Sequence, residues 1–530
     1  MSEPGSTTGI DTTGIDTEAP GHGRPRVVIV GAGFAGLAAT KALADRPWHR
    51  AQVEVTLVDQ HNHHTFTPFL YQVATALLEP TGAAHPVRSL IRKLQNTEFR
   101  LGEVTSINVT RRRVDTTHGP ILYDYLILAA GATNDYFGNT DISAHSLGLN
   151  TLGEALALRN HILSCFEAAA WVTDPTERAR LLTFAVVGGG PTGVEFLAAL
   201  AVLVTEMVVH DFPGIGTDDP RIVLVEAAPS PLGAFAPDLR EAAAKALAAK
   251  GVQVESNAKV ADVDDTGLRL DSGRRIEAAT VVWAAGVRAT PLADTLPATG
   301  SNGRAIVKAT LQLERHAEVF VVGDMAEIPG VAGPLPMLAQ VAIQSGRHAG
   351  RQILRLCAGQ EPTPFRYRDL GTMAALGRGD AVAQVGRLHL SGLEGWLAWF
   401  GLHIVRTVGL QAKVTVVADW ASGFLFADRP VRLITGPDHP RRAATKLLGP
   451  EPATARVPMA RAKVDLPSVN VANANRWGRV AALAWWGQAY PGLRKEPEKP
   501  HGLEALRQRS EKLRHELTGD KSQTEDNYRG

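Results

Sequence analysis

Three glycines with the spacing GxGxxG follow an apolar stretch near the start of the chain. The stretch 27–30 is expected to be a strand, and Gly31, Gly33 and Gly36 come directly after it. The first glycine permits a tight turn, the second lets the backbone approach a pyrophosphate, and the third lets a helix pack on the strand. The next strand ends in Asp59, whose carboxylate can accept hydrogen bonds from a ribose diol. Strand, loop, helix, strand and acid together predict a dinucleotide site.

The same pattern occurs a second time. The expected strand 184–187 precedes Gly188, Gly190 and Gly193, and a later strand, "RIVLVE", ends in Glu226. A carboxylate at this place accepts hydrogen bonds from the adenosine 2′-hydroxyl and repels a 2′-phosphate, so it predicts NAD rather than NADP. The distance along the chain to Glu226 is longer than usual. The alternative interpretation is a solvated acid at a strand end.

Two further segments are expected to position these loops. An apolar strand at 126–129 precedes Gly131, and "ATVVWAAG" repeats that design before Gly286. Each is typical of a chain that crosses between two nested domains. The strand "EVFVVGD" then ends in Asp324, which can bind the ribityl and phosphate side of a flavin nucleotide or cap the next helix. We therefore expect one tightly held flavin and one diffusing nicotinamide nucleotide.

A pair of glutamines raises a separate question of chemistry. In "AQVAIQSG", Gln340 and Gln344 stand four residues apart, so a helix would place both on one face. Buried amides need hydrogen-bond partners. The residues alone leave two alternatives, in which the amides meet a bound ligand or bind neighbouring backbone groups.

Composition excludes several other classes of protein. The 530 residues exceed one domain and carry a formal net charge of +1 at pH 7, so no basic field indicates nucleic acid. Cys165 and Cys357 form no CxxC motif, so we expect neither a dithiol redox site nor a metal site. No stretch reaches the roughly 18 apolar residues of a spanning helix. The N-terminus lacks the regions of a secretory signal.

Over roughly residues 26 to 436 the chain resembles the type II, single-subunit NADH:quinone oxidoreductases. The resemblance implies a two-dinucleotide, disulfide-reductase-like fold, bound FAD, NADH as substrate and a membrane quinone as acceptor. It also implies respiratory electron transport without proton pumping. The matching stretches are "HNHHTFTPFLYQVATALLEP", "GGGPTGVEF", "VVWAAGV", "AQVAIQSG", "GTMAALGR" and "LSGLEGWLAWFGLHIVRTVG".

The resemblance assigns roles to individual residues. It implies that Gln340 lies near the flavin, that the backbone of Val341 meets the flavin's pyrimidine end, and that Gln344 faces the quinone headgroup. Glu195 is the acid that it implies beside flavin and nicotinamide, although the helix dipole also favours an acid in a first turn. The whole set expected to bind cofactors is Gly31, Gly33, Phe34, Ala35, Gly36, Asp59, Val104, Ala130, Gly131, Asp324, Gln340, Val341, Gly188, Gly190, Pro191, Thr192, Gly193, Glu226, Ala285 and Gly286.

One position departs from the family pattern. Many members carry a lysine within "DKG", whereas this chain has Leu370 in "RDLGTMAALGR". A leucine donates no proton, so Asp369, Arg366 or water would have to substitute for the lysine. This change leaves three alternatives open, which are an altered quinone preference, a lower activity and a different acceptor.

The segment from Ser391 is expected to attach the protein to a membrane surface. Trp396, Trp399 and Phe400 fall largely along one side of a helix, and Trp-rich amphipathic segments lie in the bilayer interface. Arginines in the segment could meet anionic headgroups. The alternative is a helix packed on the protein's own core or on a dimer partner. We expect a peripheral homodimer on the cytoplasmic face of the membrane.

The expected fold class is α/β, with two nested Rossmann-like dinucleotide-binding domains and a C-terminal amphipathic membrane-associating region. Alternatives to the main function are a sulfide:quinone reductase, a FAD- and NADH-dependent reductase with another acceptor, and a non-catalytic flavin-binding sensor. The expected divisions are a disordered 1–24, an FAD-binding domain at 25–145 and 305–366, an NADH-binding domain at 146–304, a membrane and quinone region at 367–436, and an extension of unreadable role at 437–530.

Overall fold

The structure is a computed structural model. The residues that it describes are 23–44, 46–331, 333–406, 413–414, 416–417, 420 and 432–435. The predictions for residues 1–22 and for the extension at 437–530 lie outside the described residues.

A six-stranded sheet carries the first glycine loop. All neighbouring strands are parallel except β20, and their apolar residues form one buried core, as expected when helices cover a parallel sheet. The strand order is β20 (Gln312–Leu313), β21 (His316–Val321), β9 (Tyr125–Leu128), β1 (Arg26–Val30), β2 (Glu54–Asp59) and β5 (Thr97–Leu101).

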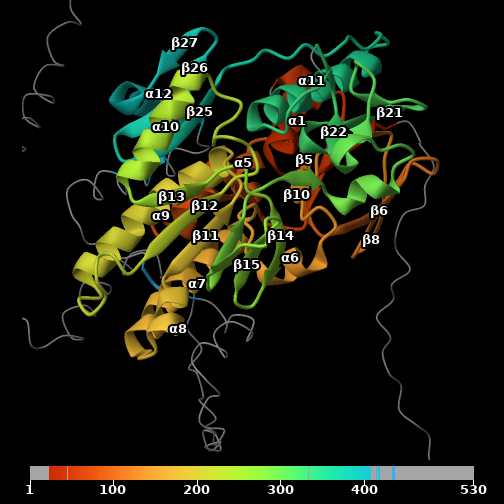
Figure 1. Cartoon of the computed structure of the whole chain (residues 1–530). Coiled ribbons are helices and arrows are strands. Elements are labelled where there is room, and N and C mark those ends of the chain that lie inside the picture. The colour runs from red at the N-terminus through yellow and green to blue at the C-terminus, as the bar shows by residue number, and fades with distance from the viewer. Residues whose placement is uncertain are drawn as a thin grey trace, which may run out of the picture. The chain divides into compact units, whose positions relative to one another are not determined.

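Helices α1 (Phe34–Ala44) and α11 (Ala339–Cys357) lie side by side next to this sheet (Figure 1). A Cβ atom at Gly346 of α11 would lie 2.1 Å from the Ala35 carbonyl oxygen of α1. The helices can approach so closely because glycine has no side chain at the contact. The segment "AQVAIQSG" is thereby held against the first glycine loop.

A second parallel sheet carries the other glycine loop. Helix α7 (Leu152–Trp171) begins with a capping box between Thr151 and Glu154, and its Phe166 ring stacks on Phe184 of the sheet at 5.9 Å. The strand order is β13 (Val252–Glu255), β12 (Arg221–Val225), β11 (Thr183–Val187) and β17 (Thr280–Trp283), with α9 (Pro191–His210) after β11 and α10 (Pro237–Ala249) after β12.

The chain leaves the first sheet after β9, builds the second sheet, and returns to the first at β20 and β21. The antiparallel pair β10 (Ala132–Asn134) and β18 (Val287–Ala289) joins the two crossings. This is the mixed α/β, nested arrangement that the repeated strand–glycine segments predicted. The exact domain boundaries stay a prediction.

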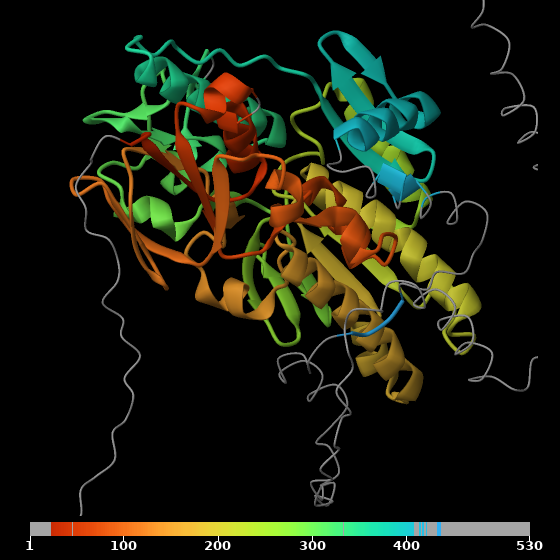
Figure 2. The ribbon, with the colours of Figure 1, turned by 180° about the vertical axis from the view of Figure 1, so that it is seen from behind.

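A small antiparallel sheet follows, made of β25 (Thr372–Gly377), β26 (Asp380–Val385) and β27 (Leu388–Leu390). Helix α12 (Gly392–Arg406) packs on β26, and α9 passes beside β25 (Figure 2). Among the described residues, no helix is long and apolar enough to cross a membrane.

The aromatic side of α12, which was predicted to face the membrane, packs against the protein itself, and this is the alternative that the sequence left open. Trp399 is only 3% exposed, and Trp396 and Phe400 pack against the core that α7, α9 and β25 share. The Trp420 ring lies tilted against Trp399, with ring centroids 5.4 Å apart, and its indole N–H donates to the Gln72 side chain at 2.8 Å. Aromatic rings at helical spacing identify a face, and here the protein's own core covers that face.

Next to its aromatic side, α12 also has exposed aliphatic residues. Leu393, Leu397 and Val405 are 60%, 56% and 71% exposed, and they stand at positions that share one helical face. A helix that buries its aromatic residues and exposes aliphatic ones has a second apolar surface available for a partner.

Short elements complete the described chain. They are α2 (Pro47–Arg50), β3 (His63–Thr65), η1 (Thr67–Phe69), α3 (Leu70–Ala74), α4 (Pro80–Ala83), β4 (Ala84–Pro86), α5 (Val87–Ile91), β6 (Val104–Asn108), β7 (Arg113–Thr116), β8 (Gly119–Leu122), α6 (Thr140–His145), α8 (Pro175–Leu181), β14 (Val260–Asp264), β15 (Gly267–Leu270), β16 (Arg275–Glu277), η2 (Pro291–Thr295), η3 (Ser301–Gly303), β19 (Ala305–Ile306), η4 (Gly323–Met325), β22 (Ala326–Glu327), β23 (Pro329–Gly330) and β24 (Gly333–Pro334).

Candidate functional site

The first glycine loop turns sharply between β1 and α1. Gly31 has a φ of +101°, and its N–H donates to the Val58 carbonyl at 2.8 Å. A Cβ atom at Gly31 would lie 2.3 Å from the Ala129 carbonyl oxygen, and one at Gly36 would lie 1.8 Å from the Gly31 oxygen. A Cβ at Gly33 would meet nothing within 4 Å. The loop is therefore tight at its first and third glycines and open at the second, where a pyrophosphate is expected.

The second loop repeats this geometry. The Gly188 N–H donates to the Val225 carbonyl at 2.9 Å. A Cβ at Gly193 would lie 2.0 Å from the Gly188 oxygen, whereas a Cβ at Gly190 would meet nothing within 4 Å. The chain thus has two open cradles of the same design, each at the start of a helix whose N–H groups attract phosphate.

The two strand-end acids bind their glycine loops in the same way. Asp59 accepts a hydrogen bond from the Ala32 N–H at 2.6 Å, and Glu226 accepts one from the Gly189 N–H. In both acids the other oxygen accepts from the backbone N–H two residues further on, at 2.7 Å. Each carboxylate is fixed at the edge of its loop, with further lone pairs for a ribose.

Asp324 supplies a buried polar atom without a partner. Its Oδ1 has no hydrogen-bond partner in the described part of the chain. Burial raises the pKa of Asp324 to about 6, although the positive charge of Arg304 opposes the shift. The adjacent Gly323 N–H donates to the Ser345 hydroxyl at 3.0 Å, which ties Asp324 to α11. An orphaned acceptor beside an open glycine loop fits FAD, whose ribityl hydroxyls would satisfy it.

The other residues predicted for FAD lie around the first loop. Phe34 and Ala35 begin α1. A Cβ at Gly31 would also come within 3.0 Å of the Ala130 Cα, and Gly131 follows with a φ of +76°. Val104 begins β6. It follows a turn in which the Gly102 N–H donates to the carbonyl of Asp59, the last residue of β2.

The remaining predicted residues separate into two groups. Pro191 and Thr192 are exposed in the first turn of α9, and Ala285 and Gly286 follow β17 at the same edge of the second sheet. Val341 is 2% exposed and packs in the core of the first sheet. Its backbone contact with a flavin stays a prediction.

The two glutamines bind the backbone of a neighbouring segment. Gln340 donates to the Gly371 carbonyl at 3.0 Å and accepts from the Leu370 N–H at 2.9 Å. Gln344 donates to the Arg368 carbonyl at 2.8 Å and accepts from the Arg368 N–H at 3.0 Å. Of the two alternatives that the sequence left open, the structure therefore shows the one in which the amides bind backbone groups. The amides fasten segment 368–371 to α11, and the predicted contact of Gln344 with a quinone stays a prediction.

The position that departs from the family pattern lies at a cavity wall. Leu370 lines the cavity described below, and Arg366 is not among the described residues that line it. Asp369, another of the named substitutes, lies within 3.5 Å of the Gln340 amide and accepts from the Gly371 N–H at 2.9 Å. Its carboxylate is therefore already used to shape this turn.

Glu195 lies in α9 where the small sheet meets the core. It accepts a hydrogen bond from the Ala375 N–H at 3.0 Å. Burial raises the pKa of Glu195 to about 8, against the opposing effects of the Ala375 N–H and the Trp399 indole. The pKa of the buried Tyr71 is raised well above its ordinary value by burial and by the nearby Glu195 charge. Glu195 therefore carries a proton at neutral pH.

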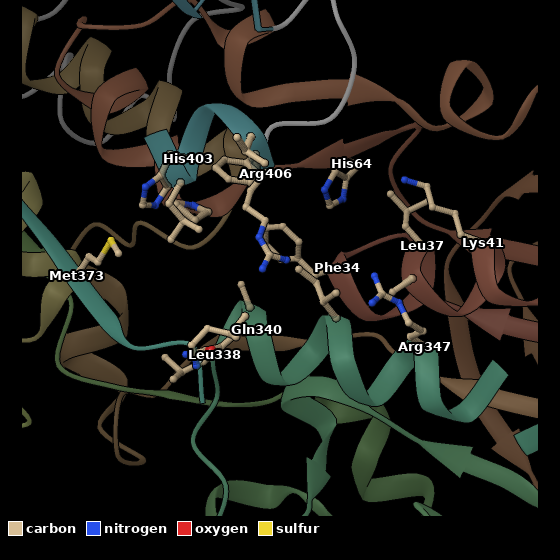
Figure 3. Close-up of a pocket in the computed structure, with 18 of the residues that line it drawn as sticks. Phe34, Leu37, Lys41, His64, Leu338, Gln340, Arg347, Met373, His403 and Arg406 are labelled. Carbon is tan, nitrogen blue, oxygen red and sulfur yellow. Dashed lines mark hydrogen bonds between the residues drawn. The ribbon is translucent and has the colours of Figure 1, made fainter. Parts of the chain in front are cut away.

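A cavity of about 630 Å³ opens between α1, α11 and α12. Figure 3 shows Phe34, Gln340 and Met373 around its interior, with His403 and Arg406 reaching it from α12. The His403 Nδ1–H donates a hydrogen bond to the Trp399 carbonyl at 2.7 Å, and burial lowers the pKa of His403 to about 4. The volume is that of a typical site for a small organic ligand.

Several of the cavity's residues were missed by sequence analysis, chiefly Lys41, His64, Arg347 and His403. Helical spacing was the available signal. Arg347 stands seven residues after Gln340, and Lys41 stands seven after Phe34, so each pair shares a helical face. The sequence does not reveal that these two faces line one cavity.

The two cysteines lie in different surroundings. The Cys165 sulfur is fully buried, 3.5 Å from the His161 Nε2 and 3.7 Å from the Thr280 hydroxyl. Cys357 ends α11 and packs against the core of the first sheet. Neither is among the described residues that line the cavity, which disfavours a sulfide:quinone reductase that needs redox cysteines beside the flavin.

Comparison with known proteins identifies the family. The model of the pyridine nucleotide-disulphide oxidoreductase family matches residues 25–346. The type II NADH:quinone oxidoreductase NdhA of Mycobacterium tuberculosis is 42% identical over 434 residues, which cover 78% of this chain and 90% of that protein. A type II NADH:quinone oxidoreductase of Staphylococcus haemolyticus is 31% identical, over 68% of this chain and 90% of that protein.

Solved structures agree at the level of the fold. NDH2 from Plasmodium falciparum in complex with NADH has a TM-score of 0.72 at 18% identity, covering 77% of this chain and 99% of that one. The sulfide:quinone oxidoreductase of Aquifex aeolicus has a lower TM-score, 0.58, at 17% identity, covering 78% and 96%. The sequence relatives and the fold together show that this chain belongs to the type II NADH:quinone oxidoreductases, within the pyridine nucleotide-disulphide oxidoreductase family.

Proposed function

We propose that this oxidoreductase uses FAD to pass electrons from NADH to a membrane quinone, and that the quinone binds in the cavity between α1, α11 and α12. FAD, when bound, accepts a hydride from the nicotinamide and hands two electrons on. The open cradle at Gly33 and the orphaned Asp324 oxygen fit FAD, and the open cradle at Gly190 with Glu226 fits NADH. In this proposal FAD is bound by the domain at 25–145 and 305–366, and NADH is bound by the domain at 146–304.

The cavity is the observation that carries the choice of acceptor. It reaches from Gln340 and Phe34, beside the first glycine loop, to Leu402 and Val405 on α12. A quinone is an apolar ring with carbonyl acceptors on a long apolar tail. A mostly apolar wall that ends at an exposed aliphatic helix face suits such a ligand. The alternative acceptor, a redox protein, would dock on the surface and would not fill a cavity.

Electron transfer to a quinone also requires two protons. Glu195 is our candidate for their source, because burial keeps it protonated at neutral pH. The Ala375 N–H donates to one carboxyl oxygen and holds it in place. Gln340 has a positioning role, since it anchors the cavity wall at Leu370 and Gly371.

Stopped-flow absorbance tests the function and its nucleotide preference. NADH is expected to bleach the flavin, and a second mix with quinone should restore its absorbance. NADPH should react with ~100-fold lower kcat/KM, because the Glu226 charge repels a 2′-phosphate and such like-charge contacts cost several kcal/mol. Glu226→Gln, which removes the charge, should narrow the difference. Bleaching without any reoxidation by quinone would instead support the non-catalytic sensor.

We further propose peripheral attachment to the cytoplasmic face of the membrane, the side where NADH is available, through the exposed face of α12. Leu393→Ser/Leu397→Ser/Val405→Ser should weaken membrane co-sedimentation ~100-fold, because each exposed aliphatic group contributes about 1 kcal/mol even when only partly buried. Flavin bleaching by NADH should not change. The homodimer stays a prediction.

A matched control for this variant is Leu101→Ser/Val254→Ser/Ile306→Ser, which replaces exposed aliphatic residues on three strands. Unchanged sedimentation of the α12 variant would refute attachment through this face. The alternative triple change at Trp396, Trp399 and Phe400 would also disturb the core, because Trp399 is buried and the other two side chains pack against the core.

A further inference from the structure

Four cations gather at the cavity between α1, α11 and α12. Lys41 comes from α1, Arg347 and Arg351 from successive turns of α11, and Arg406 from the end of α12. Figure 3 shows Lys41 and Arg347 together at one end of the cavity, on facing helices. No aspartate or glutamate is among the described residues that line it.

These cations are not compensated by the protein. All four residues are exposed, and none forms an ion pair or a side-chain hydrogen bond with another described residue. Partial burial and the neighbouring Arg347 charge lower the pKa of Lys41, so the two groups are close enough to repel each other. The whole chain carries a formal charge of only +1. The cluster is therefore a local concentration of charge, which an anion would relieve.

The surroundings indicate what kind of anion fits. The same cavity has apolar walls from Leu37, Leu338 and Ile343, and its rim includes the exposed Leu402 and Val405. A small soluble anion would bind the cations but would leave the apolar walls exposed to water. An amphipathic anion would use both, since guanidinium groups bind phosphate oxygens and the walls bind acyl chain.

We propose that Lys41, Arg347 and Arg351 bind the phosphate of an anionic phospholipid at the mouth of this cavity, with Arg406 beside it. The lipid's acyl chains would lie along the exposed aliphatic face of α12. The protein then selects membranes by headgroup charge as well as by apolar contact. This proposal deepens the proposed attachment through α12 and rests on it, while the cations add a specificity that α12 alone lacks.

The experiment is co-sedimentation of the full chain with vesicles of phosphatidylcholine alone or mixed with phosphatidylglycerol, without NADH or quinone. Wild-type protein should bind the anionic vesicles at least ~10-fold more strongly, and Arg347→Glu/Arg351→Glu should remove that preference. The matched control is Arg92→Glu/Arg111→Glu, which makes an equal change in net charge at two exposed sites in turns away from the cavity. The control should keep the preference, and flavin bleaching by NADH should confirm that both variants are folded.

Three results would overturn the proposal. They are equal binding of wild-type protein to both vesicle types, an equal loss of preference in the control variant, and release from anionic vesicles by inorganic phosphate at an ionic strength where chloride has no effect. The last result would identify a site for a soluble anion. Failure of quinone reduction would count against the proposed function alone, because the sedimentation assay uses no substrate.

Discussion

Gly33→Val is expected to leave the protein folded and to abolish FAD retention. A Cβ atom at this position meets no protein atom within 4 Å, so the fold has room for a small side chain. The same space is where the backbone must approach the pyrophosphate. Displacing the phosphates should weaken FAD by at least ~100-fold, about 3 kcal/mol. The measurement is flavin absorbance after gel filtration, with circular dichroism as the test of folding.

Two matched variants make this prediction specific. Gly190→Val is the same change at the second open cradle, and it should keep FAD while raising the KM for NADH. Gly36→Ala should instead destabilise the protein, because its Cβ would lie 1.8 Å from the Gly31 carbonyl oxygen, which is backbone and cannot move aside cheaply. If Gly33→Val retained FAD normally, the phosphates would have to bind elsewhere.

Glu195→Gln is expected to slow reoxidation of the flavin by quinone ~100-fold, the lower range for losing a general acid. Bleaching by NADH should be nearly unchanged. The wild-type rate of reoxidation should fall as the pH rises through about 8, where Glu195 loses its proton. The variant should have a flat profile in this window. A fall near pH 8 that persists in Glu195→Gln would show that another group titrates there.

Stability gives a second readout for the same residue. Between the ordinary value of 4.5 and the folded pKa of about 8, the folded protein holds a proton on Glu195 that the unfolded chain has lost. The free energy of unfolding therefore decreases as the pH rises through this window. The Glu195→Gln variant has no carboxyl group that titrates in this window, so it does not lose stability in this way. The Tm of the variant minus the Tm of wild type should therefore increase from pH 5 to pH 8. A constant difference would mean that the pKa of Glu195 is not raised.

The two glycine loops could be predicted from sequence because their requirements are local. A glycine loop, the strand before it and the acid after the next strand satisfy steric and hydrogen-bonding conditions within a short stretch of chain. The open and closed positions at Gly31, Gly33 and Gly36 agree with that reading. The repeated strand–glycine segments likewise predicted that the chain leaves the first sheet and returns to it.

The partners of shared faces could not be predicted in this way. Spacing placed Gln340 and Gln344 on one face of a helix, and only the fold brought segment 368–371 against that face. Spacing also identified the aromatic side of α12, and the fold decided that the core covers it while Leu397 and its neighbours stay exposed.

By itself, then, the sequence determined the two glycine loops and the acids that follow them, since each depends on contacts within one strand–loop–helix–strand unit. The tertiary structure alone decided which side of α12 is exposed and that Lys41 and Arg347, about three hundred residues apart in the chain, line one cavity. The physical reason is that a helical period specifies which residues share a face, whereas the neighbour of that face depends on packing between distant segments.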